Sequence, residues 1–465
     1  MGNFLNISEQ INTQYRSYAL YVIQSRGIPN FYDSLTPVQR LILENSPSKF
    51  NKTIGVVGEV IKTGLYHHGD SSLSGAISKL ARPFGCSFGI LEGDGFFGSP
   101  VNPSPSAPRY TQVKINPRIR EIIDQNYDLN EKNHEGGHDW LHVEMPIGLL
   151  THIVGIAVGY RSNILPRKLE DIVEYLGGSN KLLKPYFKDF DGKVSRYMDE
   201  DNSWLLESGF DVDRTRKIFR IFDLPPVMRY DSFINKLEAK LERLGCDYRM
   251  ENKSTSKCDI SVQIKGINDI KIFENIVDHI SKITKIIVRE DIIFVKDGNV
   301  MEFPSVKEYL DSFKTHLELV KLKRLIRDND NNLSELEFLE AKAKFLQFMM
   351  EKKRKNEEIV AFISEYKPQI SSKLQRIEIV KLSSEHLKET KDKIDDMKRE
   401  IKRIQKEISN QEKIYNKTLK EESKIKINTT RMQNSLFSSN ESNGIEIFQI
   451  EEEEIDEKVE EEEEL

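Results

Sequence analysis

Apolar residues recur at helical spacing in several short segments along the first eighty residues. Thr36 followed by Pro37 is a preferred helix start, and Asp70 is a good N-cap for the last of these segments. A short alternating stretch over 111–115 indicates a strand. Short helices with tight turns before short strands are typical of a helix-turn-helix or winged-helix module. The predicted helices cover 8–26, the residues from Pro37, 54–61 and 71–81.

Between residues 140 and 300 the pattern changes to a mixture of strands and helices. Asp297-Gly298 is a turn signal after the last predicted strand. The whole stretch predicts an α/β region. The predicted strands cover 153–158, 218–222, 258–264, 285–288 and 292–295, and the predicted helices cover 168–176 and 231–244.

From Val306 onward, the spacing of apolar residues is typical of long helices. Apolar residues from Val306 to Val320 lie alternately four and three residues apart, and a second helix fits 333–353. Apolar residues between Leu387 and Ile408 then hold a heptad register, which favours an antiparallel or dimeric coiled coil over a plain solvated helix. The residues after 430 are predicted to be disordered, because they are too poor in apolar side chains to offset chain entropy.

Charge is divided unevenly along the 465 residues. The net charge is −6, but residues 441–465 hold 13 acidic residues and one lysine. The first 440 residues therefore carry +6, and a mildly basic body with an acidic tail fits a protein that binds nucleic acid. The three cysteines lack metal-ligand spacing, and no apolar run or signal peptide is present, so we expect a cytoplasmic protein without a membrane partner.

Two short motifs match known patterns but lack the context that each pattern needs. GDGFFG (93–98) resembles a dinucleotide-binding turn, which needs a helix opening at its third glycine; the prolines that follow exclude that helix. HEGGH (134–138) resembles a zinc-peptidase motif, but its two glycines each disfavour a helix by about 1 kcal/mol. The chain also has no P-loop pattern. We therefore predict no metal ligands and no ATP site of that type in this chain.

The segment SPSAPRYTQV (104–113) is unusual because prolines crowd its approach. Prolines exclude a helix interior and favour extended backbone in their neighbours. Arg109 and Tyr110 therefore end a stiff loop just before the strand at 111–115. Taken alone, this segment fits a surface loop with an interface tyrosine.

Five motifs in a fixed order, however, resemble the DNA breakage–reunion subunit of type IIA topoisomerases over residues from about 10 to 430. Size and a single coiled-coil ending make the chain most similar to the medium subunit of the T-even bacteriophage topoisomerase, which would place it in a bacterial host. The motifs are SRGIPNFYDSLTPVQR (25–40), LYHHGDSS (65–72), ILEGDGFFGS (90–99), APRYT (107–111) and GIAVGYRSNILP (155–166).

The resemblance implies a mixed α/β architecture and several partners. It implies a homodimer that binds double-stranded DNA and works with a separate ATPase subunit, in a heterotetramer or larger assembly. That partner would hold Mg²⁺ on its acidic TOPRIM module and would bind ATP. The implied parts are an N-terminal arm (1–26), a winged-helix DNA-gate domain (27–135), an α/β tower domain (136–305), a long antiparallel coiled coil ending in a helical dimerisation gate (306–430) and a disordered acidic tail (431–465).

Matched position by position, the resemblance also implies site roles. Tyr110 would be the nucleophile that becomes linked to a 5′-phosphate, and Arg109 would stabilise the transition state. Arg40 and His68 would sit on the scissile phosphate. The implied DNA contacts are Tyr66, at the place of a family histidine; Ser71, at the start of the recognition helix; and Ile156, a wedge between base pairs, for which an ordinary buried strand residue is the alternative.

The residue types suit this chemistry. A tyrosine phenol ordinarily has a pKa near 10, so its attack needs nearby positive charge, which Arg109, Arg40 and His68 could supply. Some family positions differ: Thr36 replaces a basic DNA contact, and Glu92 and Asp94 add acidic groups near the site. A non-catalytic winged-helix and coiled-coil DNA-binding protein would explain the same fold, but not the arginine–tyrosine pair.

Overall fold

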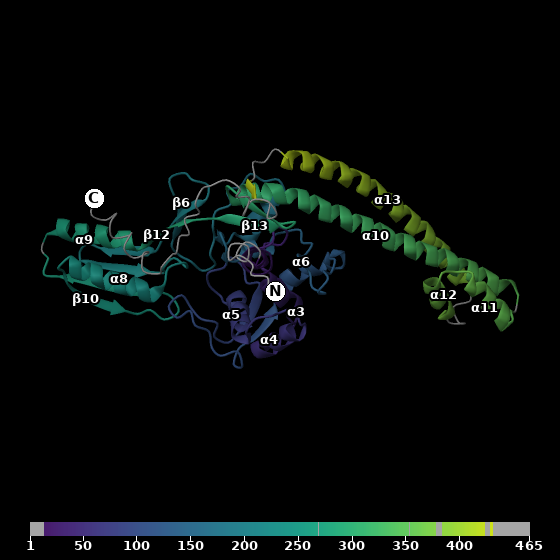
Figure 1. Cartoon of the computed structure of the whole chain (residues 1–465), viewed down its shortest axis with the longest axis horizontal. Coiled ribbons are helices and arrows are strands. Elements are labelled where there is room, and N and C mark those ends of the chain that lie inside the picture. The colour runs from purple at the N-terminus through teal and green to yellow at the C-terminus, as the bar shows by residue number, and fades with distance from the viewer. Residues whose placement is uncertain (1–13, 268, 353, 378–383, 424–427, 431–465) are drawn as a thin grey trace, which may run out of the picture.

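The computed structural model describes residues 14–267, 269–352, 354–377, 384–423 and 428–430. The whole of the predicted acidic tail (431–465) and the first part of the predicted N-terminal helix lie outside these residues. The described chain forms a central body, a lobe on one side that contains α8 and α9, and a long helical arm on the other side (Figure 1). None of the helices in these residues is long and apolar enough to cross a membrane.

Short helices and a small sheet form the lower part of the body in Figure 1, as the sequence pattern predicts. Thr36 caps α3 through a reciprocal pairing with Gln39. Asp70 is the first residue of α5 and Gly69 is its N-cap, one position earlier than predicted. The antiparallel sheet has the order β1-β3-β2. The elements are α2 (Arg16–Val22), η2 (Ile23–Gly27), α3 (Pro37–Asn45), β1 (Asn51–Lys52), α4 (Thr53–Lys62), α5 (Asp70–Ala81), β2 (Leu91–Asp94), β3 (Gln112–Ile115) and α6 (Pro117–Asp124).

The main core also includes distant residues. Side chains from 141–183 and 292–317 pack with those of the short helices in one cluster. Phe294 stacks on Tyr309 with ring centres 4.2 Å apart, which ties the start of the arm to this core. The contributing elements are η4 (Ile147–Leu150), β4 (Ile153–Ala157), β5 (Tyr160–Ile164), α7 (Leu169–Leu176), β13 (Ile292–Lys296) and β14 (Asn299–Phe303), whereas η3 (Tyr127–Leu129) has no buried residue.

Two buried histidines lie where the arm joins the body. The His316 ring lies 4.5 Å from the ring of Tyr32 and 5.9 Å from that of His142. Lys323 Nζ lies 3.2 Å from His142 Nε2. Burial is the main cause that lowers the pKa of His142 to about 4 and that of His316 to about 3, so both rings are neutral at pH 7.

The lobe has a hydrophobic core of its own, between its helices α8 and α9 and a four-stranded sheet of order β10-β11-β9-β8. The chain segments just before and just after this part form a smaller sheet of order β12-β7-β6. The predicted strands at 218–222, 258–264 and 285–288 are present with ends shifted by at most one residue. The elements are β6 (Lys193–Arg196), β7 (Ser203–Glu207), β8 (Gly209–Asp213), β9 (Ile218–Phe222), α8 (Tyr230–Arg243), β10 (Asp247–Asn252), β11 (Asp259–Lys265), α9 (Ile270–Ile283) and β12 (Lys285–Arg289).

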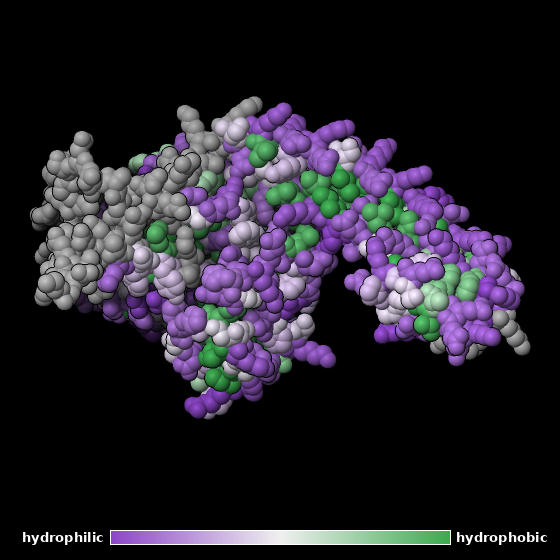
Figure 2. All heavy atoms as spheres, turned by 45° about the vertical axis from the view of Figure 1, so that its right-hand side comes forward, coloured by the Kyte–Doolittle hydropathy of each residue, from purple (hydrophilic) through white to green (hydrophobic). Residues whose placement is uncertain are grey.

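The arm is an antiparallel pair of long helices within one chain (Figure 1). The prediction of two helices over 306–353 is wrong, because α10 runs unbroken from Val306 to Glu351. Ile394 packs with Leu339 and Ala343 near the far end, and Gln411 Nε2 donates to the backbone oxygen of Glu318 at 3.2 Å nearer the body. Hydrophobic side chains follow the arm between hydrophilic flanks (Figure 2). The remaining elements are α11 (Asn356–Ser364), α12 (Pro368–Gln375), α13 (Ser384–Glu422) and β15 (Asn428–Thr430).

Candidate active site

Arg109 and Tyr110 lie at the end of the proline-rich loop, immediately before β3. The Tyr110 side chain is 68% exposed, and the Arg109 guanidinium carbon lies 5.2 Å from the centre of its ring. The Tyr110 N–H donates to the backbone oxygen of Ala107 at 2.9 Å, which closes a tight turn. The structure thus brings the phenol and a cation together at the surface, where both can meet a partner from outside the chain.

The first turn of α4 holds the backbone on both sides of Tyr110. The N–H groups of Thr53 and Ile54 donate to the backbone oxygens of Thr111 at 3.0 Å and Pro108 at 3.3 Å. The hydroxyls of Thr53 and Thr111 are buried and lie 2.8 Å apart. Because the first N–H groups of a helix have no partner inside it, the loop satisfies groups that would otherwise need water. Tyr110 therefore has a fixed backbone and a free side chain.

The proline-rich loop between β2 and β3 is folded onto itself. The Ser106 N–H donates to the backbone oxygen of Phe96 at 2.9 Å, and the Ser99 N–H donates to that of Asn102 at 2.7 Å. Gly98 has a φ of 90°, and a Cβ there would lie 2.6 Å from the Pro103 oxygen, so only glycine fits. No helix begins at Gly98. The geometry confirms that this motif is not a dinucleotide-binding turn.

Two acidic residues of β2, the strand beside β3, are engaged by side chains of β3. Glu92 forms an ion pair with Lys114 at 2.9 Å, and Asp94 accepts a hydrogen bond from Gln112 Nε2 at 3.2 Å. Among the described residues, no three His, Cys, Asp or Glu side chains are grouped so that they could hold a metal. The donor set around Tyr110 therefore does not fit a metal ion.

Tyr66, His68 and Ser71 lie together around the start of α5. The rings of Tyr66 and His68 meet edge to face with centres 5.5 Å apart, and the Tyr66 hydroxyl donates to the Gly69 oxygen at 3.3 Å. Desolvation, and next the positive charge of Arg26, lower the pKa of His68 below 6.5. The free chain thus disfavours the charged form of His68, and its role on the scissile phosphate stays a prediction. Sequence reasoning also missed Arg26, although it lies inside the first family motif.

Arg40 lies in the interior of the chain, paired with an acidic residue. Its side chain is only 3% exposed, and its guanidinium group forms a two-point pair with Asp33 at 2.7 and 3.1 Å. Asp33 also accepts hydrogen bonds from the backbone N–H groups of Leu35 and Leu141. Arg40 therefore joins three separate parts of the chain in the interior, and it cannot contact a phosphate without breaking this network. In the free chain Arg40 thus has a structural role, and its contact with the scissile phosphate stays a prediction.

Ile156 is in the predicted strand, but it is not a buried strand residue. Its side chain is 72% exposed, and Val154 on the same face of β4 is 58% exposed. The opposite face packs on η2, where a Cβ on Gly155 would lie 2.2 Å from the Gly27 oxygen. Close backbone contact on one side thus holds the strand while Ile156 projects into solvent. Its role as a wedge in DNA stays a prediction.

The two histidines of the zinc-like motif also have separate environments. His138 lies against Glu44, whereas His134 is 90% exposed, and the segment between them is a turn and not a helix. They do not share a helix face, which is the arrangement that the zinc motif requires.

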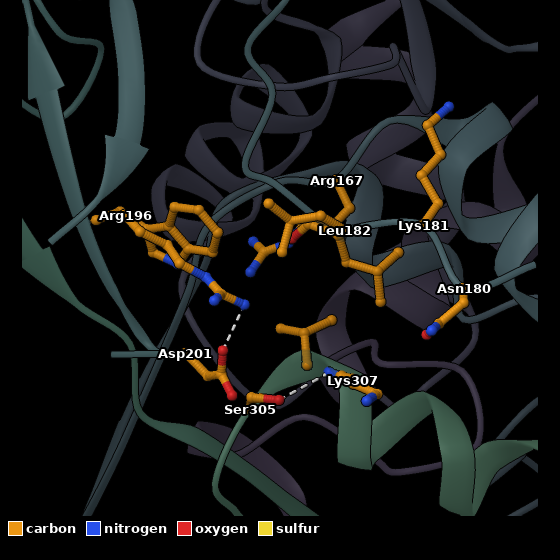
Figure 3. Close-up of a pocket in the computed structure, with 11 residues that line it drawn as sticks. Arg167, Asn180, Lys181, Leu182, Arg196, Asp201, Ser305 and Lys307 are labelled. Atoms are coloured by element: carbon orange, nitrogen blue, oxygen red, sulfur yellow. Dashed lines mark hydrogen bonds and ion pairs between the residues drawn. The ribbon is translucent and has the colours of Figure 1, made fainter. Parts of the chain in front are cut away.

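A cavity of about 200 Å³ lies between the segment 180–183 that follows α7, β7 and the start of α10 (Figure 3). Basic residues line it, but opposite charges already meet most of them. Arg167 pairs with Glu290, Arg196 with Asp201 and Lys181 with Asp171, each within 2.7 Å. We assign no binding role to this cavity.

Comparisons with known proteins identify the family of the chain. The family described as the A subunit of DNA gyrase/topoisomerase IV matches residues 26–423. The chain is 24% identical to the DNA gyrase A subunit of Haemophilus influenzae over 364 residues, which cover 69% of this chain and 40% of that protein. It is 34% identical over 185 residues to the DNA gyrase A subunit of Borreliella burgdorferi, covering 37% of this chain and 22% of the relative.

A solved structure shares the fold. The DNA-binding, cleavage and re-ligation domain of Plasmodium falciparum topoisomerase II superposes with a TM-score of 0.71 at 18% identity, covering 90% of this chain and 65% of the other. The chain thus spans less than half of the length of the two bacterial relatives. The fold agreement extends over nearly all of this chain.

Proposed function

This chain belongs to the family of the DNA gyrase/topoisomerase IV A subunit, and from that membership we propose that it is the DNA cleavage–religation subunit of a type IIA topoisomerase. The observation that carries the proposal is the pair of Arg109 and Tyr110. An exposed phenol beside a guanidinium group ends a loop whose backbone is held by α4. An alignment of this kind is what a nucleophile needs, because fixed geometry removes much of the entropic cost of reaction.

The proposed step is a transesterification on the DNA backbone. The Tyr110 phenol oxygen attacks a phosphodiester phosphorus, the bond from phosphorus to the 3′-oxygen breaks, and a 5′-phosphotyrosine and a free 3′-hydroxyl form. The phenol proton leaves with the departing 3′-oxygen or through water, so no oxidant or energy source is consumed. Arg109 stabilises the negative charge that builds up on the phosphate oxygens. The reverse reaction reseals the strand.

Other exposed residues would position the duplex. We propose that the N-terminal part of α5, with Ser71, lies on the DNA and that Tyr66 contacts its backbone. His68 would donate a hydrogen bond to a phosphate oxygen. Ile156 would insert between base pairs, which costs a few kcal/mol of unstacking and bends the duplex. The exposure of Ile156 supports this role.

The remaining requirements are assigned to partners. We propose a homodimer on double-stranded DNA that works with a separate ATPase/TOPRIM subunit in a heterotetramer or larger assembly in the cytoplasm. Mg²⁺ and ATP belong to that subunit, since Glu92 and Asp94 are already engaged by Lys114 and Gln112.

The test is covalent trapping. With the partner subunit, Mg²⁺ and supercoiled DNA, the wild-type chain should become attached to DNA when the reaction is stopped with detergent. Tyr110→Phe removes one oxygen from an exposed side chain, so folding and DNA binding should persist while the adduct and strand passage disappear. Arg109→Ala should bind DNA but cleave it about 10²–10³-fold more slowly.

Tyr127→Phe is a matched control, because Tyr127 is another partly exposed tyrosine of the same body. It should form the adduct at the wild-type rate. If Tyr110→Phe still attaches to DNA, the nucleophile is assigned wrongly. If the wild-type chain never attaches, a structural DNA-binding role replaces the enzyme.

A further inference from the structure

A cavity of about 140 Å³ lies where the proline-rich loop meets the lobe. Pro100, Val101 and Pro103 form one wall, and the segment from Leu224 to Met228, just before α8, forms another. These segments are more than one hundred residues apart in the sequence. Most of the lining residues are apolar, while polar and apolar atoms share the exposed wall about equally, so the cavity favours a ligand that has both kinds of group.

Two arginines that also line this cavity have no opposite charge. Arg82, half-buried, lies over the ring of Phe84 with its guanidinium carbon 5.1 Å from the ring centre. Arg229 is exposed at the N-cap of α8. Within the described part of the chain, neither guanidinium group forms an ion pair with a carboxylate. Asp231 also lines the cavity but pairs with neither arginine.

The charge on Arg82 is poorly compensated. Burial lowers the pKa of its guanidinium group, and Cys86 is the titratable neighbour that acts against this shift. A cation taken partly out of water without an anion is costly, and an anion that binds there recovers that cost. The cavity in Figure 3 differs in this respect, because its buried arginine, Arg167, forms an ion pair with Glu290.

We propose that the cavity lined by Arg82, Arg229 and the proline-rich loop binds a small molecule that carries one anionic group on an apolar body. Aromatic carboxylates and sulfonates are of this class. The anionic group meets the guanidinium groups, and the apolar body packs against the prolines, Val101 and Met228. The bound molecule contacts both the loop that leads to Tyr110 and the lobe, so it links these two parts.

A DNA phosphate is the other anion to consider. The walls around the arginines are largely apolar, whereas the backbone of a duplex carries a charge at every nucleotide and binds to open basic surfaces. The enclosure and the apolar lining therefore favour a small ligand. Binding at this cavity does not depend on the proposed enzymatic function.

The test uses two naphthalene probes of equal size on the full chain, measured by isothermal titration calorimetry. 2-Naphthoate should bind with one site per chain, and neutral 2-naphthalenemethanol should bind at least about tenfold more weakly. Arg229→Met and Arg82→Met should each weaken the binding of 2-naphthoate by about tenfold and leave that of the alcohol unchanged. Val101→Trp should fill the cavity and remove the binding of both probes.

Arg243→Met is the matched control, since Arg243 is an exposed arginine at the other end of α8. It should bind both probes as the wild type does. Arg229 is exposed, so its variant tests the site even if Arg82→Met unfolds. Absence of naphthoate binding to the wild type, or equal affinity in the Arg229 variant, overturns the proposal. Displacement of naphthoate by one equivalent of short duplex DNA would instead make these arginines DNA contacts and would also overturn it.

Discussion

The short-helix region, residues 30–124, and the arm formed by α10 and α13 owe their structures to different kinds of contact. In the arm, the heptad positions Ile394, Ile401 and Ile404 are buried as their spacing predicts. In the short-helix region, Asp33, which also binds the backbone of Leu141, holds the Arg40 side chain in the interior. Thr53 holds the backbone of the turn at Tyr110. Local repetition therefore specifies the arm, whereas contacts distant in sequence specify the site.

Breaking the Asp33–Arg40 pair should give the largest change. Arg40→Ala leaves a buried carboxylate without its partner, which typically costs about 3–5 kcal/mol. Hydrogen exchange of the α3 amides should report this loss. Arg118→Ala, on the exposed side of α6, is the control and should change stability by less than about 0.5 kcal/mol. If the variant kept its stability but lost DNA cleavage, Arg40 would instead act by contacting the scissile phosphate.

The seam of the arm should respond next. Ile394→Ala removes buried methyl groups that pack on Leu339 and Ala343 and should cost about 2–3 kcal/mol, seen as faster hydrogen exchange in α13. The same change at Ile414, which is 47% exposed on α13, should cost far less. Equal effects at the two positions would mean that the heptad seam does not hold the arm.

The junction of the two regions should be sensitive to pH through its buried histidines. Burial holds the pKa of His316 near 3, below the usual value near 6.5, so the unfolded chain takes up a proton first as the pH falls. Stability is present at pH 7 and is lost below about pH 6.5, by about 2 kcal/mol for His316 at pH 5. His316→Phe should reduce this pH dependence in urea unfolding. A variant that loses stability as steeply as the wild type would exclude His316 as the source.

The smallest change should come from the hydroxyl pair below Tyr110. Thr53→Val or Thr111→Val leaves one buried hydroxyl unpaired and should cost about 1–2 kcal/mol. The double variant replaces both partners by groups of similar shape and should be nearly as stable as the wild type. Additive losses in the double variant would show that the two hydroxyls do not act as a pair.

The sequence predicted most elements of both regions, because capping residues and apolar spacing act locally. The Asp297-Gly298 turn is an example: both residues have positive φ, as the tight turn between β13 and β14 needs. It did not predict that α10 is continuous, since the polar stretch near residue 330 interrupts the apolar spacing without breaking the helix.

The side-chain environments of the site were harder to predict. The position of Arg109 and Tyr110 follows from the prolines around them. The burial of Arg40 depends on Asp33 and on the backbone of Leu141, one hundred residues away, which no local pattern reveals. The exposure of Ile156 depends on the contact between Gly27 and Gly155 across two elements.

After α13 the chain runs back to the body, so the arm is attached to the body at the base of both of its helices. β15 pairs with β14 beside the start of α10, and Glu422 binds Lys296 at 3.0 Å and Ser312 at 2.6 Å. Both helices are thus attached to the same part of the body, so the arm cannot rotate freely about a single connecting chain. With a rise of 1.5 Å per residue, α10 is about 70 Å long. A tilt of about 5° at the attachment would therefore move the tip by roughly 6 Å, which is about one helical turn.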